Sequence, residues 1–411
     1  MTLALPDLPQ NWSRTRLDRV SSVNARIGWK ALTADEYEPE GYVFLSTPNI
    51  KREDIDFENV NHISEFRYLE SPELQLRVGD VLLVKDGNTL GITNYVKQLP
   101  VEATVNGSIA VLRPFGIEAR FLRFVLASDL VQGMIAAFRA GMGVPHLFQA
   151  DIKRFPLPLP PLQVQRAIAD YLDTETARID ALIEKKRRMV QLLEEKWNAF
   201  LGSCLSSAPG LPLKYLLRAP LAYGVLVPEH DLEGVPMLRI MDLAPTGVDV
   251  TNVARIPKAL SAQYRRTIVE PGDLVVSVVG TLGRSIEITP ALAGCNLNRA
   301  LARVQLRSTV PRSLVRYWFG SEPFQVMARL ATSSDSAQPT LGLGDLKNFE
   351  VGIPADPTDW QTLTTHLERS RLRTHGFIVR LQRQLVLLVE RRQALITAAV
   401  TGELEIPGAA A

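Results

Sequence analysis

PLPLPPLQVQRAIADYLDTETARIDALIEKKRRMVQLLEEKWNAFLGSCL, residues 156–205, decides the fold of this chain. Its apolar residues are spaced by sums of threes and fours, which is the period of one face of an α-helix. Pro160 and Pro161 mark its start, because proline fits the first turn of a helix but not its interior. Asp173 and Thr174 can cap a second start, and a helix from there to residue 205 would be roughly 48 Å long. The residues expected to pack on a partner helix are Ile168, Leu172, Ile179, Leu182, Met189, Leu193 and Trp197.

The partner helix is predicted at residues 359–400, where the same spacing recurs. EKWNAFLGSCL, which begins at Glu195, aligns with ERRQALITAAV, which begins 195 residues later at Glu390. Gly376 lies inside this second pattern and is expected to weaken or kink the helix. The residues expected to face the first helix are Leu367, Ile378, Leu381, Leu385, Leu388 and Leu395.

The composition is that of an ordinary globular protein. The chain has 411 residues, 46% of them hydrophobic and 22% charged, which is enough for two or more domains with cores of their own. No apolar run is long enough to span a bilayer, and no charged and apolar leader opens the sequence. We therefore expect a cytoplasmic protein without a membrane partner.

Metal, disulfide and purely electrostatic functions find little support in the sequence. The two cysteines, Cys204 and Cys295, give neither a disulfide framework nor a zinc site, and the five histidines lack metal-ligand spacing. The formal net charge of +2 does not indicate binding to nucleic acid by charge alone, although it is compatible with a local basic face.

The region before each long helix contains the same landmarks, nearly one fixed distance apart. Strands are predicted at residues 81–84, 108–113 and 274–279, and an amphipathic helix at residues 119–138. Several landmarks at nearly one offset indicate two copies of a unit made of a domain and a helix. The matched pairs, 192 to 194 residues apart, are Gly79 with Gly272, Gly91 with Gly283, Asn106 with Asn298, and Phe155 with Phe349.

This repeat predicts an α+β fold. Two mixed α/β domains would each be followed by a long helix, and the two helices would pack as an antiparallel coiled coil with approximate two-fold symmetry. A molecule with two similar domains suits a two-fold-symmetric polymer, and duplex DNA is the obvious candidate. The predicted parts are a first domain at 1–155, a helical region at 156–205, a second domain at 206–354, a second helical region at 355–402 and a tail at 403–411.

The strings PLPPLQVQRAIADYLDTETARIDALIEKK and RRQALITAAVTGELEIPG resemble the central and C-terminal conserved regions of specificity subunits of type I restriction-modification systems. The resemblance implies two target-recognition domains, each reading one half of a bipartite sequence in double-stranded DNA, with helices that set the unread spacer. It also implies docking of two methyltransferase (modification) subunits and recruitment of two restriction subunits. S-adenosylmethionine would then serve the modification subunits, ATP and Mg²⁺ the restriction subunits, and this chain would hold no cofactor.

The sequence lacks the motifs of the chemistry found elsewhere in such systems. It has no GxxxxGK[ST] loop for ATP and no tetrapeptide of the kind with which adenine methyltransferases hold a flipped base. Asp80, Asp86 and Asp273 could form a nuclease metal site, but acidic residues beside glycine at strand starts are far more often turn residues. We therefore expect a chain that is not an enzyme.

Base readout needs Arg, Lys, Asn and Gln side chains, backed by phosphate contacts from basic and hydroxyl residues. The loops of the first domain that offer this chemistry hold Lys85, Asn88, Thr89, Asn94, Lys97, Arg139, His146 and Gln149. Those of the second hold Thr281, Arg284, Asn296, Arg299, Ser333, Ser334 and Gln338. Asn106 and Asn298 occupy matched positions of the repeat, so we expect them to cap turns rather than contact DNA.

Two other functions stay open at this point. The chain could be a scaffold that binds proteins only, or a degenerate specificity subunit without DNA readout. A self-sufficient nuclease or methyltransferase is the third reading, and the missing motifs argue against it.

Overall fold

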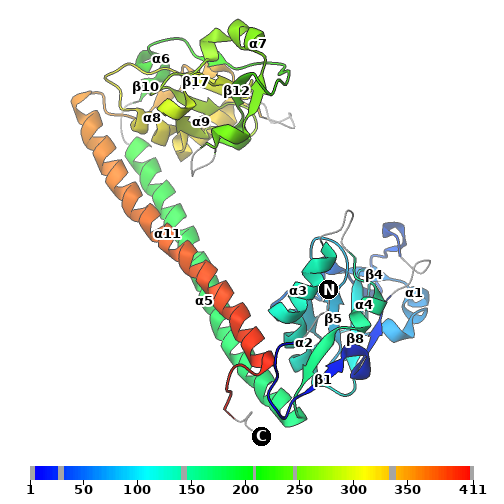
Figure 1. Ribbon diagram of the computed structural model, residues 1–411. Coiled ribbons are helices and arrows are strands. Elements are labelled where there is room, and N and C mark those ends of the chain that lie inside the picture. The colour runs from blue at the N-terminus through cyan, green and yellow to red at the C-terminus, as the bar shows by residue number, and fades with distance from the viewer. Residues whose placement is uncertain are drawn as a thin grey trace. The chain divides into compact units, whose positions relative to one another are not determined.

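The computed structural model describes residues 5–25, 32–139, 146–206, 210–243, 248–332 and 339–407. The chain divides into two compact units. Unit 1 comprises residues 1–186 and 383–411, and unit 2 comprises residues 187–382. Each unit holds one globular domain and one part of each of the two long helices (Figure 1).

Unit 1 is built on two small sheets. The first has the strand order β2-β8-β5-β6 and is antiparallel throughout; the second has the order β4-β3-β7, with β3 and β7 parallel. A separate pair joins β1 to β9. The strands are β1 (Ser13–Arg16), β2 (Ser21–Asn24), β3 (Tyr42–Leu45), β4 (Asn61–Ile63), β5 (Val81–Val84), β6 (Thr93–Tyr95), β7 (Ala103–Val105), β8 (Ile109–Pro114) and β9 (Pro156–Leu159).

Helices of unit 1 cover the first sheet, and Figure 1 shows α2, α3 and α4 beside β5 and β8. Their apolar side chains share one core with β2, β5 and β8. The predicted single helix at 119–138 is wrong, because Ser128 is extended and ends α2, while its carbonyl accepts the amide of Gln132 in α3. The helices are α1 (Glu65–Leu69), α2 (Ala119–Ala127), α3 (Asp129–Arg139) and α4 (Gln149–Lys153), with 3-10 turns at Leu17–Arg19, Ala34–Glu36, Thr47–Asn49 and Pro72–Leu74.

Unit 2 repeats this topology strand for strand. Its sheets have the orders β11-β17-β14-β15 and β13-β12-β16, β12 and β16 are parallel, and β10 pairs with β18. The predicted repeat and the α+β class are therefore confirmed. The strands are β10 (Leu211–Pro212), β11 (Ala222–Tyr223), β12 (Val235–Leu238), β13 (Ala254–Ile256), β14 (Leu274–Ser277), β15 (Ser285–Glu287), β16 (Asn296–Leu297), β17 (Leu301–Val304) and β18 (Glu350–Val351).

The helices of unit 2 also follow the order of unit 1. The pair α8 and α9 corresponds to α2 and α3, and its apolar residues share a core with β14 and β17. The helices are α6 (Leu213–Leu216), α7 (Lys258–Gln263), α8 (Arg312–Phe319), α9 (Glu322–Ala331) and α10 (Leu343–Leu346), with 3-10 turns at Ile240–Asp242, Val250–Asn252, Arg265–Thr267 and Pro290–Leu292.

The two long helices are α5 (Leu162–Ser206) and α11 (Thr358–Thr401). The helix of the predicted region at 156–205 starts only at Leu162, because residues 156–159 belong to strand β9, and that of the region at 355–402 starts at Thr358. The second helix start predicted at Asp173 and Thr174 is wrong. The hydroxyl of Thr174 donates to the carbonyl of Asp170, as a residue inside a helix does.

The helices pack on each other within each unit. In unit 1, Leu172 of α5 shares a core with Ile396 and Val400 of α11, and Arg392 holds Asp180 with two hydrogen bonds of 2.8 and 3.1 Å. In unit 2, Trp197 and Leu201 of α5 share a core with Leu367 of α11. The predicted pairing of the helices is confirmed.

The predicted contact face of α5 is wrong at two positions, while Ile168, Leu172, Ile179 and Trp197 are buried as predicted. Leu182 and Met189 are 47% and 45% exposed, whereas Ile183 is buried and Val190 is half-buried. Packed helices follow a repeat of 3.5 residues, so steps of four and three from Ile179 lead to 183, 186, 190 and 193. The predicted Leu182 and Met189 lie one position away, about 100° around the helix.

Gly376→Ala is expected to raise the free energy of unfolding by about 0.5–1 kcal/mol. Gly376 lies inside α11, and an added methyl group would meet open space there. Alanine loses less backbone entropy in a helix than glycine does. Urea unfolding would measure the change. The matched control is Gly272→Ala, which should destabilise the chain because Gly272 has a φ of +85°.

Among the helices of the described residues, none is both long and apolar enough to cross a membrane.

Candidate nucleic-acid interface

In unit 1 the fold brings the two predicted loop regions together at the end of β5. The amide of Leu147 donates to the carbonyl of Lys85 over 2.8 Å, and His146 pairs with Asp86 in a single β-bridge. The segment before α4 therefore lies along the residues that follow β5. Side chains from two stretches about 60 residues apart meet at one surface.

Asp86 organises the side chains at this point. Its carboxylate contacts the Nδ1 of His146, and the Nζ of Lys85 lies 3.1 Å from its other oxygen. The Lys85 side chain is only 8% exposed, and its charge is paired with the carboxylate of Asp86. The expectation that Lys85 offers a free cation to a DNA phosphate is wrong. The ring of His146 in turn packs edge-on against exposed Phe148, with centroids 4.5 Å apart.

The other predicted DNA-contact residues of unit 1 differ in how exposed their side chains are. Asn88 and Lys97 are exposed and Thr89 is half-buried, so these side chains can reach a ligand. Gln149 is half-buried and its amide donates to the carbonyl of Val23. The side chain of Arg139 lies outside the described residues.

Asn94 is a correction to the predicted set. It is fully buried, its amide donates to the carbonyl of Lys51 over 2.9 Å, and its oxygen accepts the amide of Tyr95. Asn94 therefore fastens the loop after β3 to strand β6. It has no free group for a base.

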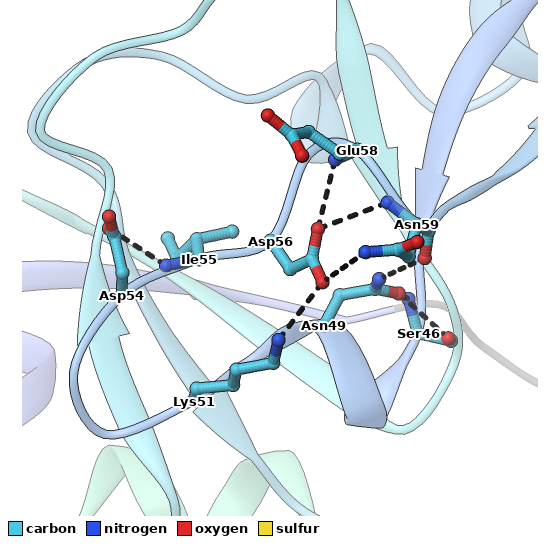
Figure 2. Close-up of polar contacts among 8 residues, drawn as sticks. All are labelled: Ser46, Asn49, Lys51, Asp54, Ile55, Asp56, Glu58 and Asn59. Atoms are coloured by element: carbon cyan, nitrogen blue, oxygen red, sulfur yellow. Dashed lines mark hydrogen bonds and ion pairs between the residues drawn. The ribbon is translucent and has the colours of Figure 1, made fainter.

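Hydrogen bonds among its own residues organise the loop that Asn94 fastens, as Figure 2 shows. Asp56 accepts hydrogen bonds from the amides of Asn59 and Glu58, at 3.0 and 2.9 Å, and from the Nζ of Lys51 at 3.0 Å. The hydrogen bonds from the Asn59 backbone, then those from the Asn59 side chain and Lys51, hold the pKa of the Asp56 carboxyl far below its ordinary value. Asn49 adds a bond to the carbonyl of Asn59 over 2.7 Å. The loop is thus ordered by its own hydrogen bonds and joined to β6 through Asn94.

Unit 2 has the same construction at the end of β14. The amide of Leu341 donates to the carbonyl of Val278 over 2.8 Å, and the amide of Gly280 donates to the carbonyl of Pro339 over 2.9 Å. Thr281, Arg284 and Arg299 are exposed beside this crossing. The amide of Arg284 is fixed by the hydroxyl of Ser277 at 2.9 Å, which leaves its guanidinium at the surface, 3.4 Å from the carbonyl of Ile240.

Asn296 is the second correction. It is fully buried, and its amide donates to the hydroxyl of Ser261 over 3.1 Å while its oxygen accepts from Thr267 over 2.7 Å. It joins β16 to the segment of α7 and cannot contact DNA in this conformation. Ser333, Ser334 and Gln338 lie outside the described residues.

The matched asparagines of the repeat have the predicted capping role. Asn106 accepts the amide of Ser108 over 3.1 Å, and Asn298 accepts the amide of Ala300 over 3.2 Å. Both bonds close the turn before the strand that follows. The prediction that they serve the shared fold is confirmed.

Asp80 and Asp273, which the sequence analysis considered for a nuclease metal site, have structural partners. Asp80 is buried and binds Arg113 through two bonds of 2.8 Å, and Asp273 is buried and binds Arg303 at 2.6 Å. Each also accepts the backbone amide three residues before it, which makes it a turn residue. Within the described part of the chain, no group of three His, Cys, Asp or Glu side chains could hold a metal ion.

Sequence reasoning missed Phe148 at this surface. Its side chain is 64% exposed next to His146, and an exposed aromatic ring beside polar loops can stack on bases. Phe148 follows Leu147 and precedes Gln149, so its residue type and neighbours gave no signal that the ring is exposed.

Comparison with known proteins links this architecture to one family. The family model described as "Type I restriction modification DNA specificity domain" matches residues 9–191. The specificity subunit of the type I restriction enzyme EcoBI from Escherichia coli is 26% identical over 348 residues, 71% of this chain and 72% of that protein. The EcoKI specificity subunit of Escherichia coli strain K12 is 23% identical over 203 residues, which are 48% of this chain and 43% of that protein.

The fold has a solved counterpart. A chain from a structure that concerns complex assembly and conformational transition of the type I R-M system superposes with a TM-score of 0.68. The superposition covers 97% of this chain and all of that one, at 18% identity. The likeness confirms the architecture of two domains and two long helices.

Proposed function

The chain belongs to the specificity subunits of type I restriction-modification systems, and we propose that each of its units reads one half of a bipartite DNA target. One observation carries the proposal. The same crossing of a strand end with the segment before a short helix occurs in both units, at Lys85 and Leu147 and again at Val278 and Leu341. The crossing presents a different set of exposed polar side chains in each unit. Two units with the same backbone arrangement and different exposed side chains suit two different half-sites.

The side chains at these surfaces have the chemistry of base and phosphate contact. Asn88 can pair with adenine and Arg284 with guanine or a phosphate, and both are exposed. A net charge of +2 gives little general attraction to DNA. The modification subunits would therefore supply part of the affinity through basic surfaces of their own. The chain itself is a non-catalytic subunit.

Exposed apolar side chains on the long helices support docking of two modification subunits. Isolated apolar residues at a surface are ordinary, but several on one helix pair favour a protein partner. Each unit carries such a set, so one modification subunit would dock on each. In unit 1 they are Leu182, Val386, Leu387 and Val389; in unit 2 they are Met189, Leu192, Leu372, Phe377 and Val379.

The cofactors of the complex would belong to the other subunits. S-adenosylmethionine would serve methylation in the modification subunits, and ATP with Mg²⁺ would serve two restriction subunits where these are recruited. Like the DNA it protects, the complex would lie in the cytoplasm.

Methylation-sensitive sequencing of genomic DNA tests the proposal. One host expresses this chain with its methyltransferase subunit, and the control host expresses the methyltransferase alone. We expect a new motif with two short defined halves around an unspecified spacer. A soluble complex that leaves no new motif would favour a protein-only scaffold or a degenerate specificity subunit.

Arg284→Ala is expected to weaken binding of the assembled complex to its target. Loss of a phosphate contact would lower affinity on all sequences and reduce the slope of log affinity against log salt by about 1, whereas loss of a guanine contact would cost about 1–3 kcal/mol at one base. Fluorescence anisotropy at several salt concentrations separates these outcomes. The control is Arg329→Ala, an exposed arginine of α9 paired with Glu322. If both variants bind with the affinity of the parent, Arg284 does not contact the DNA.

A further inference from the structure

Unit 1 contains a cavity that the DNA-reading role does not use. Its volume is about 360 Å³, and it lies between α2, the turn from β5 to β6, and the last turns of α11. Three arginines line it, together with two carboxylates and apolar side chains. The charged residues are Arg52, Arg123, Asp129, Glu390 and Arg392.

Arg123 is the unusual member of this lining. Its side chain is 8% exposed, its Nη2 donates to the carbonyl of Arg52 over 2.8 Å, and its Nε is buried without a partner. Among the described residues it forms no ion pair with a carboxylate. Burial and the nearby charge of Arg392 lower the pKa of the guanidinium, but arginine stays protonated in proteins. A buried cation without a counter-ion is costly unless a ligand supplies the charge.

Four carboxylates near Arg123 are already paired with other arginines. Arg120, one turn before Arg123 on α2, binds Glu118, Asp170 and Asp173 at 2.7 to 3.0 Å. Arg392 is neutralised by Asp180. Three carboxylates thus serve the less buried arginine. The two carboxylates of the cavity lining, Asp129 and Glu390, are exposed, and among the described residues neither forms an ion pair with Arg123.

The repeat shows that the fold does not require this arrangement. Alignment of Ser128 with Ser321 and of Gln132 with Gln325 matches Arg123 to Arg316, which is exposed. Trp197 of α5 stands where α11 has Arg392, and it packs on Tyr317, the counterpart of Phe124 in the cavity wall, with centroids 5.8 Å apart. Unit 2 thus has an aromatic contact where unit 1 has an arginine beside a cavity.

We propose that this cavity binds a small oxyanion, with the Arg123 guanidinium as its principal ligand and Arg52 and Arg392 beside it. A planar guanidinium pairs with two oxygens of a phosphate or a carboxylate at once. The volume accommodates such a group with ordered water. The oxyanion comes either free from solution or from an acidic side chain of a bound protein subunit, and both have the same chemistry.

Calorimetric titration of the full chain with inorganic phosphate, at constant ionic strength in chloride, tests the site. We expect one phosphate per chain, and a rise in Tm of about 3 °C at a phosphate concentration about tenfold above the Kd. Arg123→Met should abolish both effects. Arg316→Met, at the matched position of unit 2, should keep both.

A second variant covers the case in which Arg123→Met fails to fold. Arg52→Met changes an exposed side chain and leaves the carbonyl that accepts from Arg123, so it should fold and bind phosphate about tenfold more weakly. Absence of phosphate binding by the parent chain, binding retained by Arg123→Met, or equal loss in Arg316→Met would overturn the proposal. Loss of the phosphate site upon addition of modification subunits would identify an acidic side chain as the occupant, and retention would identify a free anion.

Discussion

Gly352→Ala is expected to destabilise unit 2 by about 3 kcal/mol or more, the upper end for a buried steric clash. A methyl group on Gly352 would lie 1.5 Å from the carbonyl oxygen of Leu205 and 2.6 Å from its carbon. Both are backbone atoms near the end of α5, so no side-chain rotation can relieve the overlap. Either the segment after β18 or the last turn of α5 would have to move. Urea unfolding followed by tryptophan fluorescence would measure the loss.

The control for this change is Gly344→Ala. Gly344 lies in α10 of the same unit, and a methyl group there would meet nothing within 4 Å. Its free energy of unfolding should stay within about 1 kcal/mol of the parent value, since only helix propensity changes. If Gly352→Ala and Gly344→Ala had the same unfolding midpoint, the segment after β18 could move away from the end of α5 at no cost, and the prediction would be wrong.

Local patterns were sufficient for the element types and for the repeat. Strand β5 has the predicted bounds, because four consecutive apolar residues after a glycine turn fit a buried strand and little else. The two helices were predicted from spacing alone. The contact face of α5 was misplaced at Leu182 and Met189, because Leu182 and Ile183 are apolar neighbours. Only the 3.5-residue repeat of a packed pair distinguishes Ile183 as the buried one.

The candidate site was harder to predict, since residue type does not reveal exposure. Asn88 and Asn94 have the same chemistry and stand six residues apart, yet one is exposed and the other is buried against Lys51. The partner of Asn94 is more than 40 residues away, so no local pattern indicates the contact. The pairing of Asp86 with His146 could not be predicted for the same reason, because the two residues are 60 positions apart. Long-range hydrogen bonds decided which polar side chains stayed free.

Arg303→Met is expected to destabilise unit 2 by about 3–5 kcal/mol, as removal of one partner from a buried ion pair does. The side chains of Arg303 and Asp273 are 7% and 4% exposed, and their charged atoms lie 2.6 Å apart. Methionine keeps most of the arginine stem and removes only the charge and its hydrogen bonds. The carboxylate of Asp273 would then be buried without its cation. Urea unfolding would report the loss.

The companion variants separate the ion pair from other effects. Arg329→Met removes an exposed pair with Glu322 and should change stability by less than about 1 kcal/mol. Asp273→Asn together with Arg303→Met should recover more than half of the loss, because asparagine still accepts the amide of Glu270 and leaves no buried charge. A double variant as unstable as Arg303→Met would point instead to the bond from Arg303 to the carbonyl of Arg266. Asp273 precedes β14, the strand that leads to Thr281 and Arg284, so the same loss should weaken recognition of the half-site read by unit 2.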